Sequence, residues 1–306
     1  LDKALNHSKN IGINECEIIV VKKKIITVRI TDSEIAEIKQ NFDEGYGIRL
    51  IHDKKIASIQ TTNQQEIEKT IDSAFKTSSK LKPRDFWRGL PHDAALKQLD
   101  GTFDEKLAKI SGEEVMDIVQ NMINSANNDM VNTITGSLNI VSENFEIANS
   151  NGLYLNDKAT YISGIINAES EFGILPVSGI GHASGRTLSN FSAEQVGNDA
   201  KIMCIESINP QKIDSDSYSI IFEPYSVGEL LAFVVAANFN FKTFSEKKSC
   251  FSNNFEEKIA MEQLSLIDDP HIPEGIGTKS VDDEGTETKK RNLIEKGIFK
   301  NTFSNL

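Results

Sequence analysis

Hydrophobic positions alternate with polar ones over much of the first 61 residues. Ile26, Val28 and Ile30 alternate with polar neighbours, an apolar run precedes them at residues 18–21, and residues 47–51 lead into a further alternating stretch. A period of two places successive side chains on opposite faces of a strand. Residues 15–61 are therefore predicted to form a meander of strands that ends in a hairpin.

Helical spacing replaces this alternation at three places, and each place begins with a capping signal. Residues 63–66, 111–114 and 192–195 carry side chains suited to capping a helix N-terminus, and apolar residues follow three or four positions apart. The three apolar stripes are Ile67, Ile71, Ala74 and Phe75; Val115, Ile118, Val119, Met122 and Ala126; and Val196, Ala200, Met203, Cys204 and Ile208. Alternation returns at residues 131–170, with a turn at 149–152. This order of strands, helices, strands and helix indicates an α+β fold rather than a regular βαβ winding.

The chain of 306 residues is long enough for two domains of about 150 residues each. Residues 1–210 are predicted to form an α+β domain, an antiparallel or mixed sheet with covering helices, with sub-segments at about 15–81 and 104–210. Between them, residues 80–104 read as a linker or extended excursion in which Trp87 is a local core anchor. A second domain is predicted for residues 217–306, which ends in what looks like the middle of a domain.

The second predicted domain begins with short apolar segments. Residues 218–222 are predicted to be a strand, and strands are also expected at 264–267 and 293–294. Residues 230–237 are apolar without interruption, which is typical of a helix buried on every side.

Composition narrows the possible partners and the compartment. The 33 basic and 45 acidic side chains give a net charge of −12, which disfavours a nucleic-acid partner. The longest apolar run has eight residues, whereas a membrane span needs roughly 20. No secretion signal is recognisable, and three widely separated cysteines suit reduced thiols, so a cytoplasmic protein is expected.

The sequence lacks the common short catalytic and cofactor motifs. No two of the five histidines are fewer than 40 positions apart, which excludes a helical two-histidine metal site. Residues 179–185 hold four residues that are not glycine between three glycines, a spacing that does not fit a dinucleotide fingerprint and favours a flexible or bulged loop. Asp282-Asp283-Glu284-Gly285 could offer carboxylates to a divalent cation, but an acidic turn is the favoured interpretation.

Several of these segments together resemble the TldD/PmbA family, known as modulators of DNA gyrase and as metallopeptidase subunits. The segment containing Gly47-Ile48-Arg49 resembles the family's Gly-x-Arg strand, and Asn149-Ser150-Asn151-Gly152 resembles its Asn-Ser-x-Gly turn. Asp282-Asp283-Glu284-Gly285 resembles its signature in the C-terminal domain. The resemblance implies that residues 217–306 begin a β-rich, barrel-like domain that is truncated here.

The resemblance also implies a lost catalytic site. In the family's active branch a Gly-x-Leu-Leu segment leads into His-Glu-x-x-x-His, whose histidines bind zinc and whose glutamate activates water. Gly228-Glu229-Leu230-Leu231 stands in the corresponding place, and Ala232, Phe233 and Ala237 occupy the positions of the ligands and the base. These side chains offer no lone pair to a metal and no carboxylate to accept a proton.

We therefore expect no catalytic, cofactor or metal-binding residue in this chain, which matches the PmbA (TldE) branch best. The expected function is that of a non-catalytic subunit in a zinc metallopeptidase system for unfolded peptides. Zinc is then expected only in an active, TldD-like paralogue that pairs with this chain as a heterodimer, and a homodimer is the other possible assembly. Two alternatives stay open: a metallopeptidase with an unrecognised site, and a non-enzymatic modulator that binds DNA gyrase.

Overall fold

The structure is a computed structural model that describes residues 1–92 and 99–304. Its chain divides into two compact units, each described here by itself. Unit 1 consists of Leu1–Gln211 and Pro273–Glu287, and unit 2 consists of Lys212–Ile272 and Thr288–Leu306. The segment Pro273–Glu287 therefore packs with the N-terminal unit, whereas the sequence predicts one continuous C-terminal domain over residues 217–306.

Unit 1 is built on a six-stranded antiparallel sheet with the strand order β3-β2-β1-β4-β5-β6. The strands are β1 (Glu15–Thr31), β2 (Glu34–His52), β3 (Lys55–Thr61), β4 (Thr133–Asn149), β5 (Tyr154–Ser170) and β6 (Val177–Gly185). The β1–β2 hairpin turns at Asp32 and Ser33, whose φ angles of 51° and 63° suit a two-residue hairpin loop. The predicted meander over residues 15–61 and the antiparallel strands after residue 131 are confirmed.

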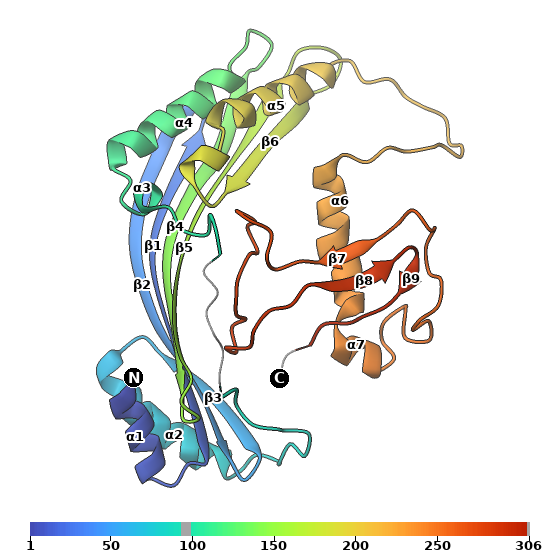
Figure 1. Cartoon of the computed structure of the whole chain (residues 1–306). Coiled ribbons are helices and arrows are strands. Elements are labelled where there is room, and N and C mark those ends of the chain that lie inside the picture. The colour runs from blue at the N-terminus through green and yellow to red at the C-terminus, as the bar shows by residue number, and fades with distance from the viewer. Residues whose placement is uncertain (93–98, 305–306) are drawn as a thin grey trace. The chain divides into compact units, whose positions relative to one another are not determined.

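The helices of unit 1 cover one face of this sheet. Even-numbered residues of β1 point to that face along its whole length, because the pairing of β1 with β4 keeps one register throughout. Cys16, Ile18 and Val20 belong to one buried cluster at one end of the strands, and Ile26 and Val28 belong to another. Helices α1 and α2 pack on the first of these clusters, and α4 and α5 pack on the second. Figure 1 shows the two pairs of helices at opposite ends of the long strands.

The capping signals place the helices where the sequence predicts them. The helices of unit 1 are α1 (Asp2–Asn10), α2 (Ile67–Ser78), α3 (Glu105–Ala108), α4 (Gly112–Ala126) and α5 (Ala193–Glu206), with 3-10 turns at Gln64–Glu66 and Leu188–Asn190. Ser111 and Glu114 form a reciprocal capping box at the start of α4. The predicted stripes are buried or half-buried, except that Met203 is exposed. Helix α1 was not predicted from its polar sequence.

The glycine-rich segment at residues 179–185 is not the flexible or bulged loop that we expected, because it lies in the regular strand β6. Its glycines allow α5 to lie directly on the sheet. A Cβ atom on Gly181 would lie 1.9 Å from the carbonyl oxygen of Val196, and one on Gly179 would lie 2.2 Å from the amide nitrogen of Cys204. The absence of side chains here is a packing requirement, not a sign of flexibility.

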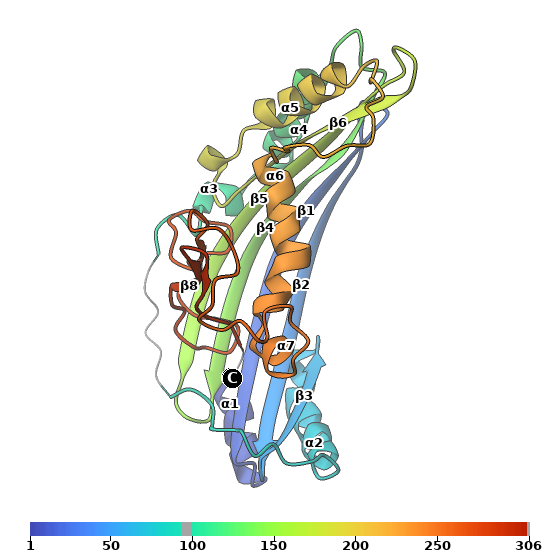
Figure 2. The ribbon, with the colours of Figure 1, turned by 90° about the vertical axis from the view of Figure 1, so that its right-hand side faces the viewer.

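Unit 2 combines one helical stretch with a small sheet. It contains α6 (Pro224–Leu230), a π-helical turn (Leu231–Val235), a 3-10 turn (Ala236–Phe239), α7 (Phe241–Ser245), β7 (Leu266–Asp268), β8 (Arg291–Glu295) and β9 (Ile298–Phe299). Figure 2 shows α6 and the two turns after it as one continuous orange helix. The three strands form an antiparallel sheet, and the described residues contain no closed barrel.

Aromatic residues form the core of unit 2. Phe239 and Phe299 are fully buried, with ring centroids 5.5 Å apart, and Leu293 and Ile294 pack in the same cluster. The strands predicted at 264–267 and 293–294 correspond to β7 and β8. No helix in the described part of the chain is long and apolar enough to cross a bilayer.

Two predictions for unit 2 are wrong. Residues 218–222 do not form a strand, and Ile221 is 97% exposed. The apolar stretch at residues 230–237 is helical but not buried, since Phe233 is 81% and Val234 is 57% exposed. A uniformly apolar helix is expected to pack against other protein atoms on all sides. The sequence does not tell whether those atoms belong to the same chain or to another one.

Candidate functional site

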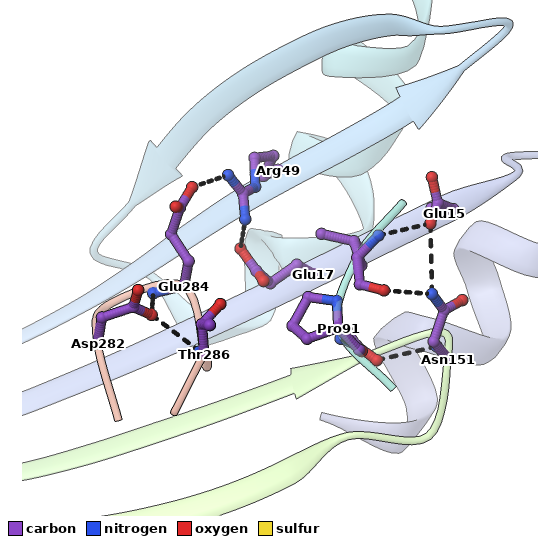
Figure 3. A network of polar contacts seen from close by, with 10 residues as sticks. Glu15, Glu17, Arg49, Pro91, Asn151, Asp282, Glu284 and Thr286 are labelled. Carbon is purple, nitrogen blue, oxygen red and sulfur yellow. Dashed lines mark hydrogen bonds and ion pairs between the residues drawn. The ribbon is translucent and has the colours of Figure 1, made fainter. Parts of the chain in front are cut away.

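Three segments that are far apart in the sequence meet in unit 1. They are the Gly-x-Arg segment of β2, the turn between β4 and β5, and the acidic turn at residues 282–285. Figure 3 shows two neighbouring groups of polar contacts, one that joins Arg49 to Glu17 and the acidic turn and one that joins the turn between β4 and β5 to Glu15 and Pro91. All three carry the family resemblance, so the structure brings the resembling motifs to one place.

The strand register sets the floor of this site. Glu17 on β1 lies directly opposite Arg49 on β2 and also opposite Asn149 on β4, and Arg49 lies opposite Ser58 on β3. Directly opposite residues of antiparallel strands point to the same face. The four side chains therefore form a row across the sheet, on the face that α1 and α2 do not cover.

Arg49 is the centre of the charged part of the network. Its Nη2 lies 2.9 Å from Glu17 Oε1, and its Nη1 forms an ion pair with Glu284. Its guanidinium carbon lies 5.6 Å from the centre of the Trp87 ring, which adds a cation–π contact. The Glu17 side chain is only 2% exposed, so it depends on Arg49 for its compensating charge.

Glu17 is a carboxyl group whose charge changes near neutral pH. Burial raises its pKa to about 7, the nearby positive charge of Arg49 opposes that rise, and the negative charge of Glu284 adds to it. Its second oxygen, Oε2, is buried and has no hydrogen-bond partner among the described residues. A buried carboxyl with a pKa in this range can hold or release a proton under physiological conditions.

The acidic turn is stabilised by its own first carboxylate. Asp282 Oδ1 accepts hydrogen bonds from the backbone N–H groups of Glu284 (2.9 Å) and Thr286 (2.8 Å), as Figure 3 shows. Gly285 has a φ of +75°, which suits glycine at this turn. The segment forms the predicted turn, and one consequence of the turn is that Glu284 points at Arg49.

No set of three or more His, Cys, Asp or Glu side chains in the described ranges is arranged to hold a metal ion.

The other half of the network holds residues 87–91 against the sheet. Glu15 accepts hydrogen bonds from the indole N–H of Trp87 (2.7 Å) and from the backbone N–H of Leu90 (2.8 Å). Asn151 donates its side-chain amide to the carbonyl oxygen of Leu90 (2.9 Å). Trp87 and Leu90 are buried, which confirms Trp87 as a local anchor; residues 93–98 of the predicted linker lie outside the described residues.

A cleft of about 630 Å³ opens beside this network in unit 1. It is lined by Glu17, Ile19, Gly47, Ile48, Arg49, Ser58, Ile59, Gln60, Asp283 and Glu284. Gly47 has no side chain, so the floor is flat between Ile19 and Gln60, the residues opposite it on β1 and β3. The cleft thus offers buried charge, exposed amide and hydroxyl groups, and an apolar wall.

The positions assigned to a lost catalytic site lie in unit 2. Ala232 and Phe233 are in the π-helical turn, Ala237 is in the 3-10 turn, and all three are exposed. Sequence reasoning did not single out Glu17. The available signal was a carboxylate inside the otherwise apolar run from Cys16 to residue 21, at a position that alternation assigns to the face without helices.

Two models of protein families match parts of this chain. The family model described as PmbA/TldA metallopeptidase domain 1 matches residues 16–78, and the one described as PmbA/TldA metallopeptidase C-terminal domain matches residues 215–306. The matched regions thus include strands β1, β2 and β3, which carry Glu17, Arg49 and Ser58, and the whole apolar helix of unit 2. They define the class as metallopeptidase-related proteins.

Individual relatives extend the similarity along the chain. An uncharacterised protein of Methanocaldococcus jannaschii is 23% identical over 302 residues, 98% of this chain and 69% of that protein. Metalloprotease PmbA of Escherichia coli O157:H7 is 23% identical over 294 residues, 92% of this chain and 64% of that protein. The crystal structure of TldE from Thermococcus kodakarensis has the same fold, with a TM-score of 0.84 at 19% identity over 99% of this chain and 69% of that one. The chain belongs to the TldD/PmbA family.

Proposed function

We propose that this chain is a non-catalytic subunit of a zinc metallopeptidase system that processes unfolded peptides. Its partner in the proposal is a zinc-bearing relative of the TldD branch. The chain contributes peptide-contacting walls and a subunit interface, while the partner contributes the hydrolytic site. Membership of a family named for metalloproteases supports the general class of activity.

The observation that carries this proposal is the character of the helix at residues 230–237. Where the active branch carries zinc ligands and a general base, this helix carries alanine and phenylalanine. Zinc does not fit these positions, because no side chain there offers it a lone pair. No catalytic step by zinc is therefore assigned to this helix.

The exposure of the same helix supports a role in assembly. Phe233 is 81%, Val234 57% and Leu230 48% exposed, and the preceding segment exposes Ile221 and Phe222 as well. Several exposed apolar side chains in one helix and in the segment before it are typical of an interface with another protein or with an apolar peptide. A subunit that has exchanged polar catalytic side chains for apolar ones at this position is suited to binding, not hydrolysis.

Co-expression with a zinc-bearing paralogue tests the proposal. We expect the two chains to co-purify, the zinc to be assigned to the paralogue by metal analysis, and cleavage of an unfolded peptide to require the complex. Phe233→Asp should weaken the association, whereas Phe86→Asp, a matched change at a phenylalanine of unit 1 that is 66% exposed, should not.

Two results would contradict the proposed role. Chelator-sensitive cleavage by this chain alone, with about one tightly held zinc per chain, would show an unrecognised catalytic site. Capture of a topoisomerase from nuclease-treated lysate, without a zinc-bearing paralogue, would favour the gyrase modulator instead.

A further inference from the structure

Strand β2 has a long open edge in unit 1. Strand β3 pairs with residues 46–52 of β2, whereas residues 34–45 pair only with β1 within the described residues. Along this part the backbone N–H and C=O groups of alternate residues point away from the sheet. Residues 38–44 are all exposed, including Ile38 at 43% and Phe42 at 72%.

This edge is able to accept another strand. Proteins commonly protect sheet edges with proline, with bulges, with very short strands or with charged side chains. Residues 34–45 contain no proline, and the one register shift between β1 and β2 lies at Arg29 and Ile30, near the hairpin turn. The edge is therefore regular over most of its length. Its charged side chains Glu37, Lys39, Asp43 and Glu44 disfavour most strands, so it pairs only with a strand of complementary charge.

We propose that this edge pairs antiparallel with the same edge of a second copy of the chain, about a two-fold axis at Ile38. Opposite side chains must point to the same face, so the axis passes through a residue and not between two residues. With Ile38 on the axis, Glu37 of each copy lies opposite Lys39 of the other. The pairing joins two six-stranded sheets into one continuous sheet of twelve strands, twice the six of each unit 1.

Charge and the central residue together select this register. An axis at Glu37 places that glutamate opposite its own copy, and an axis at Lys39 places two lysines together. An axis at Gln40 places Glu37 opposite Asp43 twice. Like charges directly opposite each other destabilise a strand pair, and opposite charges stabilise it. An axis at Asn41 also gives two attractive pairs, Lys39 opposite Asp43, but it places two asparagines at the centre. The axis at Ile38 combines two attractive charge pairs with a central contact between two isoleucines.

A charge exchange on the chain alone tests the interface by sedimentation equilibrium. Lys39→Glu replaces both attractive pairs with repulsive ones and should raise the dimer dissociation constant by about tenfold or more. Adding Glu37→Lys to that variant restores the complementarity and should restore the dimer. Lys69→Glu, an equal charge change at an exposed position of α2, should leave the dimer unchanged. A monomeric wild-type chain, or a double variant as weak as Lys39→Glu, would overturn the proposal.

Cysteine cross-linking tests the register itself. In a Cys250→Ser background, which removes the exposed native thiol, Ile38→Cys should form an intermolecular disulfide under mild oxidation. Gln40→Cys alone should not, but it should cross-link to Ala36→Cys when the two variants are mixed. Self-linking of Gln40→Cys, or no linking at residue 38, would overturn the pairing and leave the edge free for an extended peptide. Because both tests use this chain alone, their outcome is separate from that of the proposed subunit role.

Discussion

Replacing Glu17 by Gln removes the buried carboxyl group that pairs with Arg49 but keeps the shape of the side chain. In the wild type, burial raises the pKa of Glu17 to about 7, compared with 4.5 for an exposed glutamate. Between these two pH values the unfolded chain has released the proton and the folded chain still holds it. The free energy of unfolding therefore falls as pH rises from 4.5 to 7, and each pH unit contributes about 1.4 kcal/mol.

The whole interval corresponds to about 3 kcal/mol of stability, fully present below pH 4.5 and lost once Glu17 ionises in the folded state. Glutamine cannot titrate, and Arg49 keeps its ion pair with Glu284 in the variant. The stability of Glu17→Gln relative to the wild type should therefore rise by about 3 kcal/mol between pH 4.5 and 8.

Urea titrations followed by fluorescence measure this difference in unit 1, because Trp87 is the only tryptophan in the chain and contacts Arg49. Glu105→Gln, at a glutamate whose pKa is lowered by its hydrogen bond with Lys109, is the control and should show no such rise between pH 5 and 8. If the difference in unfolding free energy between Glu17→Gln and the wild type did not change with pH, the raised pKa of Glu17 would be refuted. A difference that falls with pH would show that the attraction of Arg49 outweighs burial.

Three further outcomes test the packing of the two units by chemical or thermal unfolding. Gly181→Ala should cost about 3 kcal/mol or more, because the new methyl group meets a helix carbonyl oxygen 1.9 Å away, whereas Gly45→Ala meets nothing within 4 Å and should cost little. Phe239→Ala should cost about 3 to 5 kcal/mol because its ring is fully buried in unit 2, while Phe233→Ala, 81% exposed, should change the stability of the chain alone by less than about 0.5 kcal/mol. Equal effects of the two phenylalanine changes would contradict the exposure of the apolar helix. Ser111→Ala should cost about 1 kcal/mol by removing the capping box of α4, and Ser111→Asp should recover most of that loss.

Local signals predicted much of unit 1. The spacing of Ser111 and Glu114 specifies a capping box wherever the chain folds, because both partners lie within one turn of helix. The alternation at Ile26, Val28 and Ile30 likewise names the buried face of β1, because a strand turns successive side chains to opposite sides. Such features depend on neighbours a few positions away, so a sequence alone reveals them.

The contacts among Glu17, Arg49 and Glu284 cannot be predicted from local sequence patterns. Glu17 and Arg49 are 32 positions apart, and Glu284 is 235 positions from Arg49. Their encounter depends on the register of β1 with β2 and on the return of Pro273–Glu287 to unit 1. The family resemblance pointed to Arg49 and to the acidic turn, but it did not say that the two touch or that Glu17 lies beneath them.

The sequence by itself determined most of the order of strands and helices in unit 1, the faces that carry apolar side chains there, and the absence of His and Glu from residues 232–237. Tertiary structure alone decided what meets each face. The glycines of residues 179–185 lie in a strand and allow α5 to pack closely on the sheet, and the apolar helix of unit 2 is left exposed. The physical reason is that periodicity and capping are set within a few residues. Burial, ion pairing and a raised pKa are set by segments that reach the same place from distant parts of the chain.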